Sequence, residues 1–136
     1  MQVTTVIRLT STQLHPLAML AKQSLPNESC AFLLGKGDDE VTVADILPMR
    51  NADDSMVSFS IEPKEILQAY DLAEKKKLQI VGIYHSHPAR PSPSSTDIKF
   101  MEINPVTWLI YSTRDERFKA FVYDDSLREV EVKIME

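Results

Sequence analysis

The chain has 136 residues, a length that predicts one domain spanning residues 1–136 with a hydrophobic core of its own. Hydrophobic residues make up 43% of the sequence and charged residues 26%, which excludes an intrinsically disordered chain. The net charge of −5 argues against nucleic acid or an anionic membrane as a partner, because both bind basic surfaces.

The cysteine content and the apolar runs indicate a cellular location. Cys30 is the single cysteine, so an intrachain disulfide is excluded. The first residues do not have the basic and then apolar pattern of a signal peptide, and no apolar run reaches the roughly 18 residues of a membrane helix. These features together predict a reducing, cytoplasmic location, and they leave the oligomeric state open.

The first half of the chain alternates between β-rich runs and one amphipathic pattern. Apolar residues recur at helical spacing after the first run, and Pro26-Asn27 ends this pattern. A buried run follows and leads through a glycine-rich turn into a hairpin. The expected elements are a strand at 3–9, a helix at 12–25, strands at 28–35 and 41–47, and a short strand at 57–61.

The second half begins with an acidic, proline-containing segment that is typical of a helix start. Predicted strands and one further helix follow it. The expected elements are a helix from 62 to about 78, a strand at 80–87, a short helix at 96–103 and strands at 106–111, 118–123 and 130–134. Alternating charges predict that the last strand lies at a sheet edge. The order of elements predicts an α/β fold with a mixed central β-sheet and helices packed against it.

Two histidines at the end of the strand at 80–87 are the first candidates for chemistry. Side chains alternate along a strand, so His85 and His87 point to the same face. The chain has no cysteine cluster, so histidine is the main type of zinc ligand available. Taken alone, however, this pair of histidines is as compatible with a structural role as with a metal site. Asp97 follows ten residues later and would complete three ligands, leaving a fourth zinc position for water.

Further candidates have an ordinary structural interpretation as well. Ser94-x-x-Asp97 is a helix capping box, which is compatible with a role in a site. Glu28 is a candidate general base, although spacing alone favours an ordinary solvated glutamate. The hydroxyl of Ser94 could donate to a developing oxyanion. Cys30 has no basic neighbour in sequence and is expected to be a buried core residue, while His15 is expected at the surface.

Three segments together resemble the motif of the JAMM (MPN+, Mov34/PAD-1) metalloproteases. They are the segment 26–35 that contains Glu28, then His85-Ser86-His87-Pro88, and then Ser94-x-x-Asp97. The resemblance covers residues 26–97 and points to the prokaryotic stand-alone branch. It implies an MPN-like domain with cytidine-deaminase-like layering. It further implies one Zn²⁺ per chain with a catalytic water, metal ligands His85, His87 and Asp97, general acid/base Glu28 and oxyanion stabiliser Ser94.

The resemblance also implies a substrate class. The expected reaction is hydrolysis of a peptide or isopeptide bond at the C-terminal tail of a ubiquitin-like or sulfur-carrier β-grasp protein, including release of cysteine from a carrier. Ubiquitin itself is not expected, because the chain lacks the long insertions of the eukaryotic members. Six residues separate His87 from Ser94, where the family pattern has seven, and a shifted register would give the oxyanion role to Ser95.

Other functions remain as alternatives. A non-catalytic scaffold or binding module of the same fold is one, although the complete motif argues against it. Another metal-dependent chemistry is the second, because two histidines and one carboxylate also suit non-haem iron. A zinc deaminase is disfavoured, since Cys30 alone cannot supply paired cysteine ligands.

Overall fold

The computed structural model describes residues 4–49 and 63–135. Every element predicted within these residues is present, with ends that differ by a few positions, whereas the strand predicted at 57–61 lies outside them. None of the described helices is long and apolar enough to cross a membrane. In chain order the elements are β1 (Val6–Thr10), α1 (Ser11–Ser24), β2 (Cys30–Gly37), β3 (Glu40–Met49), α2 (Pro63–Lys75), β4 (Gln79–His87), α3 (Ser95–Ile103), β5 (Thr107–Ser112), β6 (Arg117–Asp124) and β7 (Ser126–Met135).

The strands form one mixed sheet that closes into a barrel in the order β1-β3-β2-β4-β5-β6-β7. Strands joined by tight turns pair antiparallel, namely β2 with β3, β5 with β6 and β6 with β7. The pairs β4–β5, β1–β3 and β1–β7 are parallel. The predicted α/β class with a mixed sheet is therefore confirmed, and the deaminase-like layering stays a prediction.

The prediction that the last strand forms an edge is wrong. β7 pairs antiparallel with β6 and parallel with β1, where Glu131 lies opposite Val6. Most of its side chains are exposed, while Val130 is buried. The alternating charges therefore reflect the exposed face of this strand, and they carry no information about whether its main-chain groups are paired.

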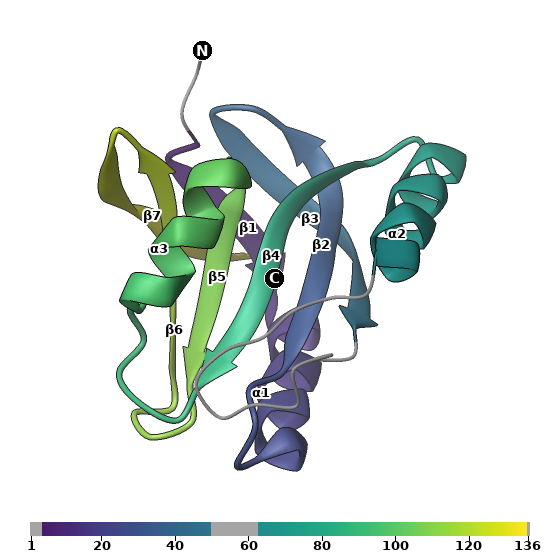
Figure 1. Cartoon of the computed structure of the whole chain (residues 1–136). Coiled ribbons are helices and arrows are strands. Elements are labelled where there is room, and N and C mark those ends of the chain that lie inside the picture. The colour runs from purple at the N-terminus through teal and green to yellow at the C-terminus, as the bar shows by residue number, and fades with distance from the viewer. Residues whose placement is uncertain (1–3, 50–62, 136) are drawn as a thin grey trace.

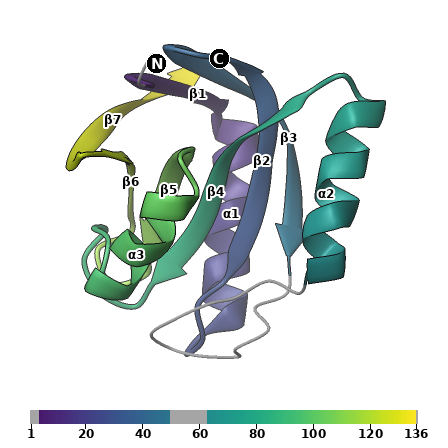
Figure 2. The same ribbon diagram turned by 45° about the horizontal axis from the view of Figure 1, so that its top comes forward.

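The helices cover the two faces of the sheet, and each face has its own hydrophobic core. Leu14, Leu17 and Ala21 of α1 pack into the first cluster. Ala69 of α2 and Met101 of α3 belong to the second cluster. Figures 1 and 2 show α1 on the opposite side of the strands from α2 and α3. The face under α2 and α3 is the one to which the two histidines point.

β4 is the strand that positions the site, because it pairs with β2 on one side and β5 on the other. Its residues from Val81 to His87 are all buried. Gly82 allows this close packing: a Cβ there would lie 2.8 Å from the carbonyl oxygen of Thr107 and 3.0 Å from Leu33 Cδ1. The polar end of β4 is thus held inside the protein between two other strands.

Candidate active site

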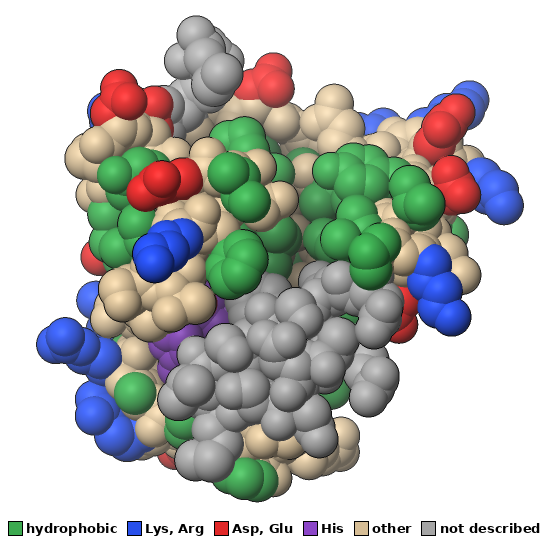
Figure 3. All heavy atoms as spheres, in the orientation of Figure 1, with side chains coloured by type: hydrophobic (Ala, Val, Ile, Leu, Met, Phe, Trp, Pro, Cys, Tyr) green, Lys and Arg blue, Asp and Glu red, His purple; other side chains and the backbone are tan. Residues whose placement is uncertain are grey.

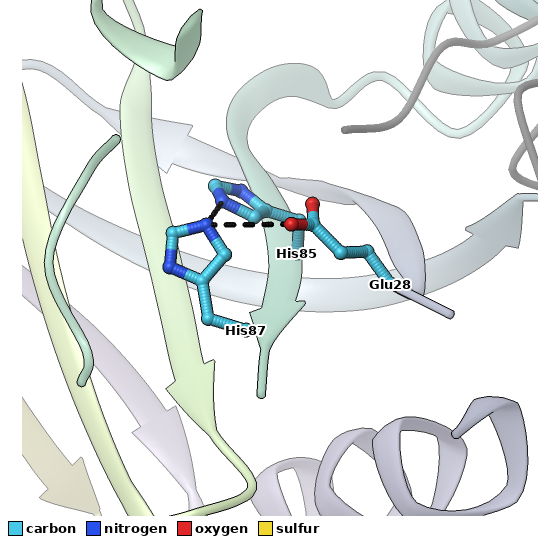
Figure 4. Close-up of side chains that lie close together, drawn as sticks. All are labelled: Glu28, His85 and His87. Atoms are coloured by element: carbon cyan, nitrogen blue, oxygen red, sulfur yellow. Dashed lines mark hydrogen bonds and ion pairs between the residues drawn. The ribbon is translucent and has the colours of Figure 1, made fainter. Parts of the chain in front are cut away.

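His85 and His87 lie at the C-terminal end of β4 and point to the same face, as alternation along the strand predicts (Figure 4). Their Nε2 atoms are 3.0 Å apart, and the side chains are buried. Trp108 of β5 packs edge-on against His85, with ring centroids 5.6 Å apart. Burial and the contact with Trp108 therefore restrict the orientation of the His85 ring.

Asp97 reaches the histidines from the first turn of α3. Its Oδ2 lies 3.2 Å from Nε2 of His85 and 2.9 Å from Nε2 of His87. The three atoms form a triangle whose sides measure 2.9–3.2 Å. Tetrahedral zinc, with bonds of about 2.0–2.1 Å, holds its ligand atoms about 3.4 Å apart. The donor set and its spacing therefore fit a zinc ion.

Asp97 also has the capping role predicted for it. The main-chain N–H of Ser94 donates to Oδ2 of Asp97 at 2.8 Å, and the N–H of Asp97 donates to Oγ of Ser94 at 3.1 Å. These two bonds form a capping box at the start of α3. The six-residue loop between His87 and Ser94 therefore brings Asp97 to the histidines in a fixed orientation.

Glu28 lies just before β2, and the structure places it at the cluster and out of solvent. Its side chain is 2% exposed, and its Oε2 lies 3.7 Å from Nε2 of His87 (Figure 4). A second possible set of metal ligands consists of Glu28, His85 and His87. Each residue offers one ligand atom, and these atoms lie within 4.8 Å of one another. Oδ2 of Asp97 lies 2.9 Å from the same His87 nitrogen, which is closer than Oε2 of Glu28.

Burial and mutual charge shift the pKa values of these groups. Burial raises the pKa of Glu28 to about 8, with His87 opposing the shift and Asp97 adding to it. Burial lowers the pKa of His85, which suits a neutral metal ligand.

In His87 and Asp97 the pKa shifts run against the effect of burial. Burial alone would lower the pKa of His87, but the hydrogen bond and charge of Asp97 outweigh it and raise this pKa. Burial alone would raise the pKa of Asp97, yet hydrogen bonds from His85 and His87 hold it well below its usual range. The two carboxyl groups thus favour positive charge between them, which a divalent cation would supply.

A cavity of about 270 Å³ opens beside Glu28 and His87. Ser94 lines this cavity, whereas Ser95 does not and is instead the exposed first residue of α3. The hydroxyl oxygen of Ser94 accepts a hydrogen bond from the main chain, so its own proton remains available to a group in the cavity. This arrangement favours Ser94 over Ser95 as the donor.

A second cavity, of about 310 Å³, forms an apolar groove between α2 and α3. Trp108 lines this groove and also packs against His85, so the groove adjoins the histidines. Hydrophobic side chains gather on both flanks in Figure 3. Four large apolar residues of the two helices are exposed: Leu67 (66%), Tyr70 (59%), Phe100 (39%) and Ile103 (73%).

The sequence patterns did not reveal this groove. By helical spacing Leu67 and Tyr70 belong to the apolar face of α2, yet both are exposed, and so is Phe100 of α3. The fully buried residues of α2 are Ala69 and Ala73. Because alanines occupy the inward positions of α2, its large apolar residues are not needed for the core and lie at the surface. More large apolar residues than the core needs is the sequence signal that could have indicated a binding surface.

Other expectations are confirmed. His15 is exposed. Cys30 is fully buried, and burial raises its pKa to about 12, with smaller contributions from Glu65 and Glu28. A neutral thiol at physiological pH has no nucleophilic role.

The chain is similar to proteins of known family. Residues 12–123, which contain all the site residues described above, match the family described as prokaryotic homologs of the JAB domain. A desampylase of Pyrococcus furiosus is 40% identical over 109 residues, which cover 79% of this chain and 75% of that protein.

Two further similarities extend over most of the chain. The CysO-cysteine peptidase of Mycobacterium tuberculosis is 30% identical over 122 residues, covering 85% of this chain and 82% of that protein. The solution structure of a protein from Desulfitobacterium hafniense superposes with a TM-score of 0.85 at 35% identity, covering 96% of this chain and 94% of that one.

Proposed function

The chain belongs to the family of prokaryotic homologs of the JAB domain, and we propose that it is a zinc-dependent peptidase. The bond that it cleaves on this proposal is a peptide or isopeptide bond at the C-terminal tail of a ubiquitin-like or sulfur-carrier protein. Its relatives named desampylase and CysO-cysteine peptidase support this substrate class. The convergence of His85, His87 and Asp97 beside buried Glu28 is the observation that carries the proposal.

His85, His87 and Asp97 would hold one zinc ion per chain. Asp97 lies closer to His87 than Glu28 does, at 2.9 Å against 3.7 Å, so we assign Asp97 to the metal and Glu28 to acid–base chemistry. Bound zinc would supply a Lewis acid that polarises water and the scissile carbonyl group. The hydrogen bonds between Asp97 and Ser94 would keep the carboxylate in place while the reaction proceeds.

Glu28 would transfer the proton that amide hydrolysis requires. As the attacking water forms the new C–O bond, the carboxylate takes one of its protons. As the C–N bond breaks, Glu28 returns that proton to the departing amine. A raised pKa near neutrality suits both halves of this transfer. The hydroxyl of Ser94 would donate to the oxygen of the former carbonyl as negative charge develops on it.

The apolar groove supports a protein substrate. A folded carrier that covers the exposed faces of α2 and α3 would bury Tyr70 and Phe100, and its tail would reach the histidines past Trp108. We therefore assign the groove to the carrier protein and the cavity beside Glu28 to the bond that is cleaved. The cytoplasmic location stays a prediction from the sequence.

The decisive test compares the wild type with Glu28→Gln, which keeps the size of the side chain. Metal analysis of protein purified without chelator should find about one zinc ion per chain in both. Hydrolysis of a β-grasp carrier conjugate should fall about 10²- to 10⁴-fold in the variant. Equal activity of the two proteins would refute the role of Glu28.

Two other outcomes would refute the peptidase proposal itself and not only the role of Glu28. Absence of bound metal even after zinc addition would overturn the proposal as a whole. A wild type that binds a carrier conjugate, with zinc present, and cleaves none of a panel of such conjugates would establish the non-catalytic scaffold instead.

A further inference from the structure

Ser86 lies between the two histidines on β4, and its side chain points to the opposite face of the strand. The residue is buried, and its hydroxyl contacts the residue that follows Glu28. The main-chain N–H of Ser29 donates to Oγ of Ser86 at 2.9 Å, and the hydroxyl oxygens of the two serines are also 2.9 Å apart. Ser86 in turn donates its main-chain N–H to the carbonyl of Ser29 at 3.0 Å.

This pairing continues the sheet one step beyond β2. The ladder between β2 and β4 has Cys30 opposite His85, so Ser29 and Ser86 would form the next pair. Such a pair exchanges two main-chain hydrogen bonds in a regular antiparallel ladder. Here the N–H of Ser86 makes one of them, and the N–H of Ser29 is directed to the Ser86 hydroxyl. The side chain of Ser86 thus substitutes for a main-chain acceptor where the ladder ends.

A buried hydroxyl network anchors the same point to helix α1. The hydroxyl of Ser29 lies 3.3 Å from that of Tyr84, and the Tyr84 hydroxyl donates to the carbonyl of Leu17 at 2.8 Å. These side chains lie on the face of the sheet that α1 covers. Ser29 is therefore held to β4 through Ser86 and to α1 through Tyr84.

We propose that Ser86 is a positioning residue that fixes Glu28 relative to the metal ligands. The inference rests on the proposed function, because it assumes that Glu28 transfers the proton. Glu28 lies outside the ladder and next to Ser29, and its carboxylate stands 3.7 Å from His87. Ser86 ties the main chain beside Glu28 to the strand segment that carries both histidines. One side chain thus couples the base to the ligands from the opposite face.

Kinetics of substituted proteins test this coupling. Ser86→Ala removes the acceptor of the Ser29 N–H, and we expect kcat to fall about 10- to 100-fold, because a displacement near 1 Å can lower a rate that far. KM for the carrier conjugate and the zinc content should stay within two-fold of the wild type. Ser86→Thr keeps a hydroxyl and should recover most of kcat.

Ser29→Ala is the matched control. It removes both hydroxyl contacts of Ser29 and keeps the main-chain N–H that donates to Ser86. We therefore expect Ser29→Ala to retain most of kcat. A loss as large as that of Ser86→Ala would show that the hydroxyl network, and not the main-chain anchor, carries the effect, and would overturn the proposal.

A double-mutant cycle tests whether Ser86 acts through Glu28. In a Glu28→Gln background, Ser86→Ala should lower kcat no further, because the group that it positions is already inactive. An equal additional loss in both backgrounds would refute the coupling. So would a Ser86→Ala protein that has a lower melting temperature and the wild-type kcat.

Amide hydrogen exchange followed by NMR gives a readout that needs neither substrate nor metal. Ser86→Ala should speed exchange of the Ser29 amide at least ten-fold, while the amide of Leu33 in the same strand should change little. Unchanged exchange at Ser29 would refute the anchor whatever the kinetics show. If exchange responds as expected and the wild type cleaves no carrier conjugate, the proposed function fails and the anchoring stands.

Discussion

Ser94 is the residue in which helix capping and the proposed chemistry meet. Its Oγ accepts the N–H of Asp97 at the start of α3, and the same side chain lines the cavity beside Glu28. Capping uses a lone pair of the hydroxyl, whereas oxyanion stabilisation would use its proton. Substitutions can therefore separate the two roles.

We predict that Ser94→Asp keeps the cap and loses the donor. A carboxylate is a good N-cap acceptor and is favoured by the helix dipole, so the melting temperature should stay close to that of the wild type. The variant has no hydroxyl proton to donate, and kcat should fall about 100-fold. Thermal unfolding and steady-state hydrolysis of a carrier conjugate measure the two effects.

Ser94→Thr and Ser94→Ala complete this series. Threonine keeps acceptor and donor and should retain most activity, while alanine loses both and should also reduce stability by about 1 kcal/mol. Wild-type kcat in Ser94→Ala would show that Ser94 only caps the helix.

Cys30 gives a prediction about alkaline pH. Burial raises the pKa of this thiol from 9.0 to about 12 in the folded protein. Between pH 9 and 12 the unfolded chain loses the thiol proton while the folded chain keeps it. The free energy of unfolding should therefore fall as the pH rises through this window, and urea titrations at pH 8 and pH 10 should show it. Cys30→Ala should make this dependence shallower.

The same thiol can be probed by chemical labelling. At pH 8, a thiol reagent should label native Cys30 far more slowly than the denatured chain, because the side chain is fully buried and neutral. Equally rapid labelling of native and denatured protein would show that this core is open.

At the scale of elements, α2 and α3 determine what lies next to the active site. Ala69 and Ala73 face the sheet from α2, so this helix packs closely and its larger apolar residues point outward. Phe100 and Ile103 extend the apolar surface on α3. The two helices therefore flank a groove whose floor includes Trp108, the neighbour of His85.

We predict that Tyr70→Ala weakens carrier binding and leaves the chemical step intact. KM for a carrier conjugate should rise about ten-fold, equivalent to ~1.4 kcal/mol, and kcat should change little. The fold should tolerate the change, since this side chain is 59% exposed. Steady-state kinetics with an intact conjugate and with a short peptide of the carrier tail check the prediction, because only the conjugate has the folded carrier that would cover Tyr70.

Leu127→Ala is the matched control for Tyr70→Ala. Leu127 is an exposed apolar residue, 40% accessible, and it lies on β7 and not in the groove. It should leave KM for the conjugate at the wild-type value. Equal rises of KM in the two variants, or a rise with the short peptide, would contradict the assignment of the groove.

At the scale of the whole molecule, the site joins segments that are far apart in sequence. Glu28 precedes β2, the histidines end β4, and Asp97 lies in the first turn of α3. Pairing of β2 with β4 and the contacts of Asp97 with both histidines hold these segments together, and a zinc ion would add a further link. Ligands that bind only the folded state raise its stability, by about 4 kcal/mol at a thousand times their dissociation constant.

We therefore predict that a strong chelator lowers the melting temperature of the zinc-loaded protein by roughly 10 °C. Glu28→Gln should show the same decrease, because Glu28 is not assigned as a ligand. Asp97→Asn should be less stable at the outset and respond weakly to the chelator. Calorimetry with and without chelator measures this, and the reverse pattern in the two variants would make Glu28 the ligand and Asp97 the base.

Local patterns in the sequence determined the secondary structure and part of the site. Alternation along a strand places His85 and His87 on one face, and a capping box places Ser94 and Asp97 together, since each relation spans only a few residues. The motif as a whole also identified the family before any contact was known.

Only the tertiary structure decided what lies against these local features. Glu28 looks like a solvated glutamate by spacing alone, and it reaches the site because Cys30 pairs with His85. β7 looks like an edge, and it is paired because the barrel closes onto β1. Tyr70 has the spacing of a buried residue and faces a groove. Periodicity reports which face of an element is apolar, whereas the partner of that face depends on residues far away in the chain.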